Sequence, residues 1–334
     1  MQRQIHEYHP LIGYRFIPGI SARVPHEGGG YLVKTNEAGF RCDHEFTQEK
    51  PAGKFRVLLF GDSFTAGDGV SNQYRYGDVL ESHFSELEIL NFGLSGSGTD
   101  QQYLIFQEFA RSLEYDLLMI CPLVENIRRI ISRYRPATLR ASGEEGVLAK
   151  PYFEFADDKL VLQHVPVPKQ IFRENELSAE DQKFIDNGGA HVALRRVVNS
   201  ALKPLKPFIQ AMTSYQPVPQ YDRPSDPAWL LMKAILTRWI GESDGHPVLI
   251  CPIPLYQHVE QTASAEHYQQ RFQELADLEQ VTVVDPLPRF WEETPADRRR
   301  CRFNSDPHLT VYGHQVLAAA LQPALAEFLR SKAS

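Results

Sequence analysis

Short apolar runs alternate with longer amphipathic stretches over most of the 334-residue chain. An apolar run bounded by turn residues is typical of a strand buried on both faces of a parallel sheet. This pattern predicts strands at 57–60, 87–91, 117–121, 248–251 and 281–284. Apolar positions with the period of an α-helix predict helices at 76–84, 100–113, 229–240, 265–278 and 311–328. Thr310 is suited to cap the last of these helices.

Strands that alternate with helices require crossover connections, which favour a parallel sheet with helices on both faces. We therefore expect a three-layer α/β/α sandwich built on five parallel strands. In such sheets, functional residues gather at the carboxyl ends of the strands. Gly61-Asp62-Ser63 follows the first predicted strand, and the segment from Cys121 to Asn126 follows the third.

Two segments fall outside this repeat. Residues 1–53 are rich in Gly, Pro and aromatic residues, and we expect irregular chain with short strands packed on the sandwich. Residues 127–225 form a long insertion between the third and fourth strands, in which 152–155 and 160–164 predict a β-hairpin. A long proline-rich connection suits a lid or binding element. Residues 54–126 and 226–334 would then form the core domain.

The charge and composition narrow the class of protein. A formal net charge of −7 argues against general binding to nucleic acids or membranes. No apolar run reaches the roughly 18 residues of a membrane span, and residues 1–8 lack the apolar core of a secretion signal. We therefore expect a cytoplasmic location. The cysteines show no paired spacing, which favours reduced thiols over disulfides or a zinc site: Cys42, Cys121, Cys251 and Cys301.

Ser63 is a candidate nucleophile because it follows a buried strand directly, provided that a histidine can accept its proton. Such a histidine occurs in Asp306-Pro307-His308, far along the chain. Taken alone, a serine at this position is more often part of a turn or a helix cap. The glycines of segment 91–100 strengthen the hypothesis, because backbone N–H groups close to a ligand can stabilise an oxyanion.

Two other interpretations of the glycine segment are weaker. No Gly-Lys-Ser/Thr follows it, which argues against a phosphate-binding loop. The glycines follow the second strand rather than the first, which argues against a dinucleotide fold. Asn126 ends the loop after the third strand and could donate to an oxyanion, although on its own a helix cap is the commoner role.

These blocks together resemble the SGNH (GDSL-type) hydrolase family over residues ~54–126 and ~246–330. The resemblance implies a flavodoxin-like sandwich with strand order 2-1-3-4-5. It implies Ser63 as the nucleophile, His308 as the base and Asp306 as the acid that orients the base. The oxyanion hole would consist of the Ser63 and Gly96 N–H groups and the Asn126 side chain. Members of the family act without a metal or cofactor, so none is expected here.

Two blocks depart from the pattern of this family. The third block usually reads Gly-x-Asn-Asp, whereas Val124-Glu125-Asn126-Ile127 keeps only the asparagine. The last block usually reads Asp-x-x-His, and here it is one residue shorter. Asp285, at the end of the fifth strand, is therefore a weaker alternative for the acid. We expect His314, inside the last helix, to be structural.

The family includes esterases, lipases, thioesterases, carbohydrate deacetylases and acyltransferases. We expect a serine esterase or deacylase that acts on an O-acylated sugar or another small ester. Three alternatives remain at this stage: an acyltransferase with the same site, a binding module that has lost the chemistry, and a flavodoxin-like nucleotide-binding protein. The sequence leaves the oligomeric state open.

Two arginine runs flank the predicted catalytic loops. They suggest an anionic substrate or carrier, although solvated surface charges explain them equally well. Arg129 and Arg133 are the candidates for substrate binding. The two runs consist of Arg128, Arg129, Arg133, Arg135 and Arg140, and of Arg298, Arg299, Arg300 and Arg302.

Overall fold

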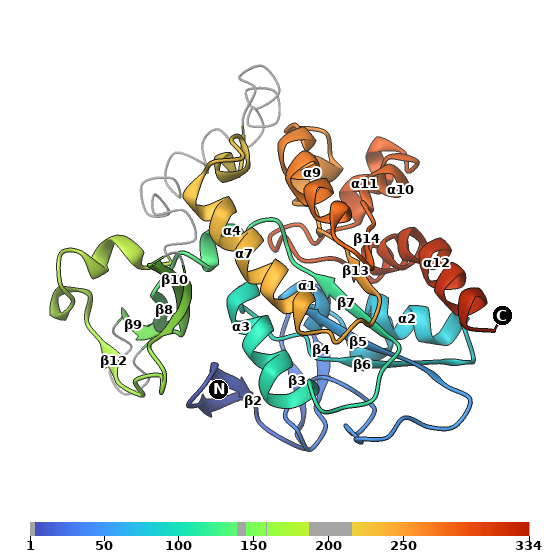
Figure 1. The fold of residues 1–334 in the computed structure, drawn as a ribbon, viewed down its shortest axis with the longest axis horizontal. Helices are drawn as coiled ribbons and strands as arrows, with labels where there is room; N and C mark the ends of the chain where they lie inside the picture. Colours follow the sequence, from blue (N-terminus) through green and yellow to red (C-terminus); the bar gives the residue numbers. More distant parts are fainter. Residues whose placement is uncertain (1–3, 139–144, 158, 187–215, 334) are drawn as a thin grey trace.

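A computed structural model describes residues 4–138, 145–157, 159–186 and 216–333 (Figure 1). Its centre is a five-stranded parallel sheet with the order β14-β13-β7-β5-β6. Numbered among themselves along the chain, these strands have the order 2-1-3-4-5, as expected. Their bounds are β5 Phe55–Gly61, β6 Leu87–Asn91, β7 Leu117–Cys121, β13 Val248–Ile250 and β14 Val281–Val283.

Helices cover both faces of this sheet, which confirms the predicted three-layer sandwich. On one face, α3 (Thr99–Ile105) packs against α7 (Pro227–Gly241), and Phe60 of β5 meets Trp239 of α7. On the other face, α2 (Tyr76–His83) packs against α12 (Val311–Ala333). Leu59, the neighbour of Phe60, points to this second face and touches Gly77. Successive side chains of β5 thus fill opposite halves of the core.

Some predicted elements differ in extent from those observed. The predicted helix 100–113 is split into α3 and a π-helical turn, η2 (Phe106–Ala110). The predicted helix 265–278 is split into α9 (Glu266–Gln273) and a 3₁₀ turn, η6 (Glu274–Asp277). We expected β14 to be buried on both faces, but its residues are only partly buried or exposed because it forms one edge of the sheet.

The N-terminal residues form two short antiparallel pairs. β1 (His6–His9) pairs with β2 (Gly13–Phe16), and β3 (Ser21–Val24) pairs with β4 (Tyr31–Lys34). Apolar side chains of this segment belong to the main hydrophobic core, among them Ile12, Phe16, Val33 and Phe40. The expected short strands are present, and they are packed on the sandwich.

The described part of the insertion contains two small sheets. The first has the order β12-β9-β8, and the second is the predicted hairpin of β10 and β11. The hairpin packs on α3 and α7 of the sandwich, while the three-stranded sheet has a small core of its own. The bounds are β8 Tyr134–Thr138, β9 Glu145–Ala149, β10 Tyr152–Ala156, β11 Lys159–Gln163 and β12 Ile171–Phe172.

Short helices connect the larger elements. The α-helical ones are α1 Ser63–Ala66, α4 Asn126–Arg129, α8 Tyr256–Val259, α10 Leu287–Trp291 and α11 Pro295–Arg300. The 3₁₀ turns are η1 Asn72–Tyr74, η3 Glu174–Glu176, η4 Asp181–Phe184 and η5 Pro219–Tyr221. Within the described ranges, no helix combines the length and the apolar character needed to cross a bilayer. The four cysteines are free and buried.

A fully buried arginine holds the loop that follows α1. Arg41 is inaccessible to solvent, and its guanidinium donates to the carbonyl oxygens of Gly67 (2.8 Å) and Val70 (2.7 Å). It also donates to Asn72 Oδ1 (3.1 Å). Burial lowers the pKa of Arg41 to about 10, so the side chain stays charged at neutral pH. The N-terminal segment is thereby tied to the loop beside Ser63.

Replacing Arg41 with methionine should destabilise the fold, because three buried acceptors would lose their donor. We expect the free energy of unfolding, measured with urea, to fall by about 3 kcal/mol. The matched control is Arg23→Met, since Arg23 is exposed and donates to the carbonyl oxygen of Gly29; it should stay within about 0.5 kcal/mol of the parent. Equal stability of the two variants would contradict a structural role for Arg41.

Candidate active site

Ser63 lies at a sharp turn from β5, an interior strand of the sheet, into the short helix α1. Asp62 caps this helix and accepts a hydrogen bond from Phe64 N (3.0 Å). Gly61 is required because a Cβ there would lie 2.0 Å from Thr65 Oγ1 and 2.8 Å from the carbonyl oxygen of Cys121. The turn thus presents the Ser63 side chain at the carboxyl end of the sheet.

The structure brings together the three residues expected to form a triad. His308 Nε2 lies 2.8 Å from Ser63 Oγ, although the two residues are 245 positions apart. His308 Nδ1 forms a short hydrogen bond with Asp306 Oδ1, which also accepts from the backbone N–H of His308 at 2.9 Å. The single residue between them, Pro307, therefore does not prevent Asp306 from orienting the imidazole.

Two residues that we did not predict support Asp306. His26 Nε2 lies 3.2 Å from Asp306 Oδ2, the carboxylate oxygen that does not face His308. Glu27 accepts from the N–H groups of Ser305 (2.9 Å) and Asp306 (2.8 Å), which fixes the backbone of the loop. His26 and Glu27 lie in the glycine-rich N-terminal segment, where no motif in the sequence points to a catalytic loop almost 280 residues away.

The electrostatics of the site favour a charged imidazolium beside a carboxylate. Burial lowers the pKa of His308, but the hydrogen bond to Asp306 and the charges of Asp68, Asp306 and Asp62 outweigh it and raise the pKa above its usual value. Burial raises the pKa of Asp306, but hydrogen bonds from His308 and His26 outweigh it, and the net shift is strongly downward. The carboxylate is therefore ionised at neutral pH and stabilises the protonated imidazole.

Three candidate oxyanion donors lie around the turn. The backbone N–H groups of Ser63 and Gly96 donate to no other group in the described ranges. Gly96 has φ +78°, a conformation that favours glycine. Asn126 is completely buried, and neither atom of its side-chain amide has a hydrogen-bond partner among the described residues. Such an amide is available to a ligand.

The position of α4 directs Asn126 toward this region. Arg129, three residues further along α4, donates to Asp62 Oδ2 (2.9 Å) and to the carbonyl oxygen of Ser97 (3.1 Å). Residues three apart lie on the same face of a helix. Arg129 thus ties α4 to the Ser63 turn and the glycine loop, and Asn126 lies on the same side of this helix as Arg129.

The loop that contains Gly96 is held by two hydrogen bonds. The hydroxyl of Tyr14, from the N-terminal strand β2, donates to the carbonyl oxygen of Ser95 (2.7 Å). The hydroxyl of Ser95 donates to Asp68 Oδ1 (2.6 Å). Tyr14 comes so close to Gly96 that a Cβ there would lie 3.2 Å from its hydroxyl oxygen. The N-terminal segment thus contributes to both the acid and the oxyanion sides of the site.

The two arginines predicted to bind substrate are engaged within the protein. Arg129 forms the ion pair with buried Asp62. Burial lowers the pKa of Arg129, but the charge of Asp62 outweighs it and raises the pKa. Arg133 pairs with Asp181 (3.4 Å) and Glu154 (3.6 Å), and its guanidinium lies over the ring of Phe184. Their positions indicate structural roles rather than contact with a substrate.

The alternative acid does not reach the site, and the second histidine is structural. Asp285 accepts from Gln269 Nε2 (2.5 Å) and from Leu287 N (3.0 Å) instead of from His308. His314 is buried and accepts from Tyr76 N (3.2 Å). Burial lowers the pKa of His314 to about 3, so it stays neutral at ordinary pH, as a structural histidine should.

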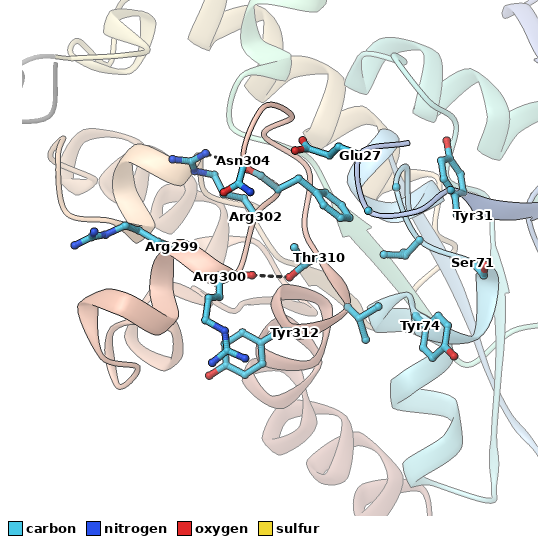
Figure 2. A pocket seen from close by; sticks show the side chains of 16 residues that line it. Glu27, Tyr31, Ser71, Tyr74, Arg299, Arg300, Arg302, Asn304, Thr310 and Tyr312 are labelled. Carbon is cyan, nitrogen blue, oxygen red and sulfur yellow. Dashed lines mark hydrogen bonds between the residues drawn. The ribbon is translucent and has the colours of Figure 1, made fainter. Parts of the chain in front are cut away.

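The second arginine run borders a cavity of about 670 Å³ that Ser63 and His308 do not line. Figure 2 shows Arg299 and Arg300 on one side of this cavity and Tyr31 and Tyr74 on the other. Arg300 pairs with Asp297 (2.7 Å). Of the other two arginines, Arg302 pairs with Glu260 (2.7 Å), and Arg298 donates to the carbonyl oxygen of Glu293 (3.1 Å). Arg140, of the first run, lies outside the described residues.

Comparisons with known proteins give only distant likenesses. No protein-family model matches the chain, and no curated protein matches it. Among solved structures, it is similar to a member of the lipolytic protein G-D-S-L family from Veillonella parvula (11% identity, TM-score 0.41, covering 80% of this chain and 97% of that one). An acetyl xylan esterase shows 13% identity and a TM-score of 0.43, covering 81% of this chain and 99% of its own. A lipase/acylhydrolase from Enterococcus faecalis shows 12% identity and a TM-score of 0.43, covering 81% and 95%.

At such low identities and TM-scores, these likenesses carry no argument about the chemistry of this chain. The order of the sheet and the geometry around Ser63 are properties of the chain itself, and its function has to be inferred from them.

The pairing of Asp306 with His308 predicts how the imidazole titrates. In an NMR titration, His308 should change charge above its usual pKa of about 6.5, and Asp306→Asn should lower that midpoint, because the variant removes a stabilising negative charge. His44 is the internal control: its hydrogen bond to Glu81 raises its pKa, and its midpoint should not move. An unchanged His308 midpoint in the variant would exclude Asp306 as its partner.

Proposed function

We propose that the protein is a serine esterase or deacylase of the SGNH (GDSL-type) kind, acting on an O-acylated sugar or another small ester. The observation that carries this proposal is the Ser63–His308–Asp306 arrangement, with Ser63 Oγ 2.8 Å from the imidazole and the carboxylate on the opposite ring nitrogen. This geometry is that of a serine nucleophile with its general base and orienting acid.

In the first half of the reaction, Ser63 Oγ attacks the ester carbonyl carbon while His308 Nε2 takes the hydroxyl proton. The carbonyl oxygen gains negative charge as the tetrahedral intermediate forms. The imidazolium then gives its proton to the leaving alcohol, and an acyl-serine ester remains. Asp306 fixes the tautomer of His308 and stabilises its charged form, which is consistent with the raised pKa of that histidine.

The negative oxygen would accept hydrogen bonds from Ser63 N–H, Gly96 N–H and the Asn126 side chain. The two backbone groups have no acceptor in the described structure, and the Asn126 amide is buried without a partner. A buried donor without a partner costs folding free energy. A preorganised donor that is satisfied only as charge develops is an effective way to stabilise a transition state.

In the second half, a water molecule or another alcohol attacks the acyl-serine, with His308 again acting as the base. The bond between the acyl carbon and Ser63 Oγ then breaks, and His308 gives the proton to Ser63 Oγ, which restores the free serine. Water as the attacking group releases the carboxylic acid, and an alcohol gives a new ester. We propose hydrolysis as the main reaction. A module that has lost its chemistry would have no need to keep the Ser63 hydroxyl, His308 and Asp306 in hydrogen-bonding contact, so this alternative is less well supported.

Replacing Ser63 with alanine should abolish turnover of activated acetyl esters and labelling by a fluorophosphonate probe, because that probe reacts with an activated serine hydroxyl. His308→Ala should also lose labelling, since Ser63 would lose its base. The matched control is Ser82→Ala, an exposed serine of α2, which should label and turn over like the parent. Labelling of the Ser63→Ala protein would contradict the assignment of the nucleophile.

Replacing Asn126 with leucine separates a catalytic role from a structural one. We expect turnover to fall by about 10²–10³, the usual effect of losing one oxyanion donor. The melting temperature should stay equal or rise, because the buried amide makes no hydrogen bond that leucine would break. A large loss of stability with little loss of turnover would show that Asn126 supports the fold instead of the reaction.

A further inference from the structure

Among the described members of the first arginine run, the structure distinguishes one from the other three. Arg128 pairs with Glu125 (3.4 Å), Arg129 with Asp62 (2.9 Å) and Arg133 with Asp181 (3.4 Å). Arg135, in β8, has no carboxylate partner among the described residues. It is partly buried, so water screens its charge less than that of a fully exposed arginine.

Arg135 lies against the wall of the proposed active site. Its guanidinium carbon is 3.8 Å from the centre of the Tyr14 ring, a cation–π contact. The Tyr14 hydroxyl in turn donates to Ser95 O (2.7 Å) and lies beside Gly96, one of the proposed oxyanion donors. A single ring therefore separates this cation from the loop at which the ester carbonyl would be held.

From this arrangement we infer that Arg135 binds an anionic group of the ester substrate, such as a carboxylate or a phosphate, next to the oxyanion loop. The inference rests on the proposed function and narrows it to acidic esters. Arg135 thereby replaces Arg129 and Arg133 as the candidate for substrate binding. The charges of those two arginines are neutralised by ion pairs within the protein.

Arginine suits this role because its planar guanidinium offers several N–H donors to the oxygens of a carboxylate or phosphate. The guanidinium lies against the Tyr14 ring and also interacts with its hydroxyl, but it carries five N–H donors, more than this one contact uses. Tyr14 is only 9% exposed and is fixed by its hydrogen bond to Ser95, so it holds the cation in place.

Two acidic groups near the proposed oxyanion loop, Asp62 and Asp68, have partners other than Arg135. Asp62 is paired with Arg129. Asp68 accepts from the Ser95 hydroxyl, and Arg41 Nη1 lies 4.0 Å from its carboxylate. Both carboxylates therefore have partners of their own, which reduces their repulsion of an incoming anion.

The anion could belong to either part of the ester, and paired substrates distinguish the two cases. In the first pair, an aryl monosuccinate carries the negative charge on its acyl part, and an aryl butyrate is its neutral counterpart. In the second pair, an acetylated glucuronate carries the negative charge on its alcohol part, and an acetylated glucose is its neutral counterpart. The quantity to compare is the ratio of kcat/KM for the charged ester over the neutral one in each pair.

Arg135→Gln should lower this ratio by about tenfold or more in at least one pair, because it removes a charged hydrogen bond made only by the acidic ester. Arg135→Lys keeps the charge and should retain part of the preference. The matched control is Arg223→Gln, an exposed arginine between η5 and α7 that makes the same change in net charge; it should keep the parent ratio. A parent-like ratio for Arg135→Gln in both pairs would overturn the inference.

Binding to the Ser63→Ala protein, measured by calorimetry with the same four esters, separates this inference from the proposed function. Adding Arg135→Gln to that protein should weaken binding of the charged ester about tenfold relative to its neutral counterpart. If the parent hydrolyses none of the esters but this difference appears, the esterase proposal fails and the anion site stands. If the esters are hydrolysed and the difference is absent, the esterase stands and the anion site is wrong.

Discussion

The hydrogen bond between Ser63 and His308 requires that two distant parts of the chain meet at the carboxyl end of the sheet. Ser63 is fixed by the turn out of β5, which lies between β6 and β7, and at this turn a side chain larger than that of Gly61 would clash with Thr65 and with the Cys121 carbonyl. His308 is fixed by the loop that precedes α12, a long helix packed on α2. The parallel strands are buried under helices on both faces and form a closely packed, rigid support. This support holds Ser63 and His308 at hydrogen-bonding distance, although they are 245 positions apart in the sequence.

Much of the site is arranged through buried charge. Asp62 and Arg129 form an ion pair next to the nucleophile, and Arg41 holds the loop after α1 through carbonyl groups. Buried ion pairs contribute little net stability, but the loss of one partner leaves an uncompensated charge. Their consequence here is geometric: the turn around Ser63 and the glycine loop share one set of hydrogen bonds, so neither can shift without the other.

The sheet and the triad could be predicted from the sequence because their signals are local. Apolar runs mark the strands, and Gly-Asp-Ser and Asp-Pro-His each lie in a few consecutive residues. The contact between Asp306 and His308 is visible only in the structure, since a motif one residue shorter than usual does not by itself show that its carboxylate reaches His308. The hydrogen bonds place it there and exclude Asp285.

The partners of the site residues were not predictable, because they are defined by tertiary contacts alone. His26, Glu27 and Tyr14 lie in a segment whose sequence suggests only irregular chain. The arginine runs show the converse: they are conspicuous in the sequence, but the ion pairs that neutralise most of them depend on which acidic residues the fold places nearby. A run of arginines in a sequence therefore does not indicate a binding site until the ion-pair partners of each arginine are known.

The N-terminal segment touches the site on two sides, and this has a consequence for how the protein can be shortened. Residues 1–53 contain none of the proposed triad residues, so the triad alone would suggest that a fragment beginning at β5 is sufficient. Such a fragment would lose the groups that hold the Asp306 loop and the Gly96 loop. The sandwich alone would therefore lack part of the proposed site, because residues 1–53 supply the contacts that hold these two loops.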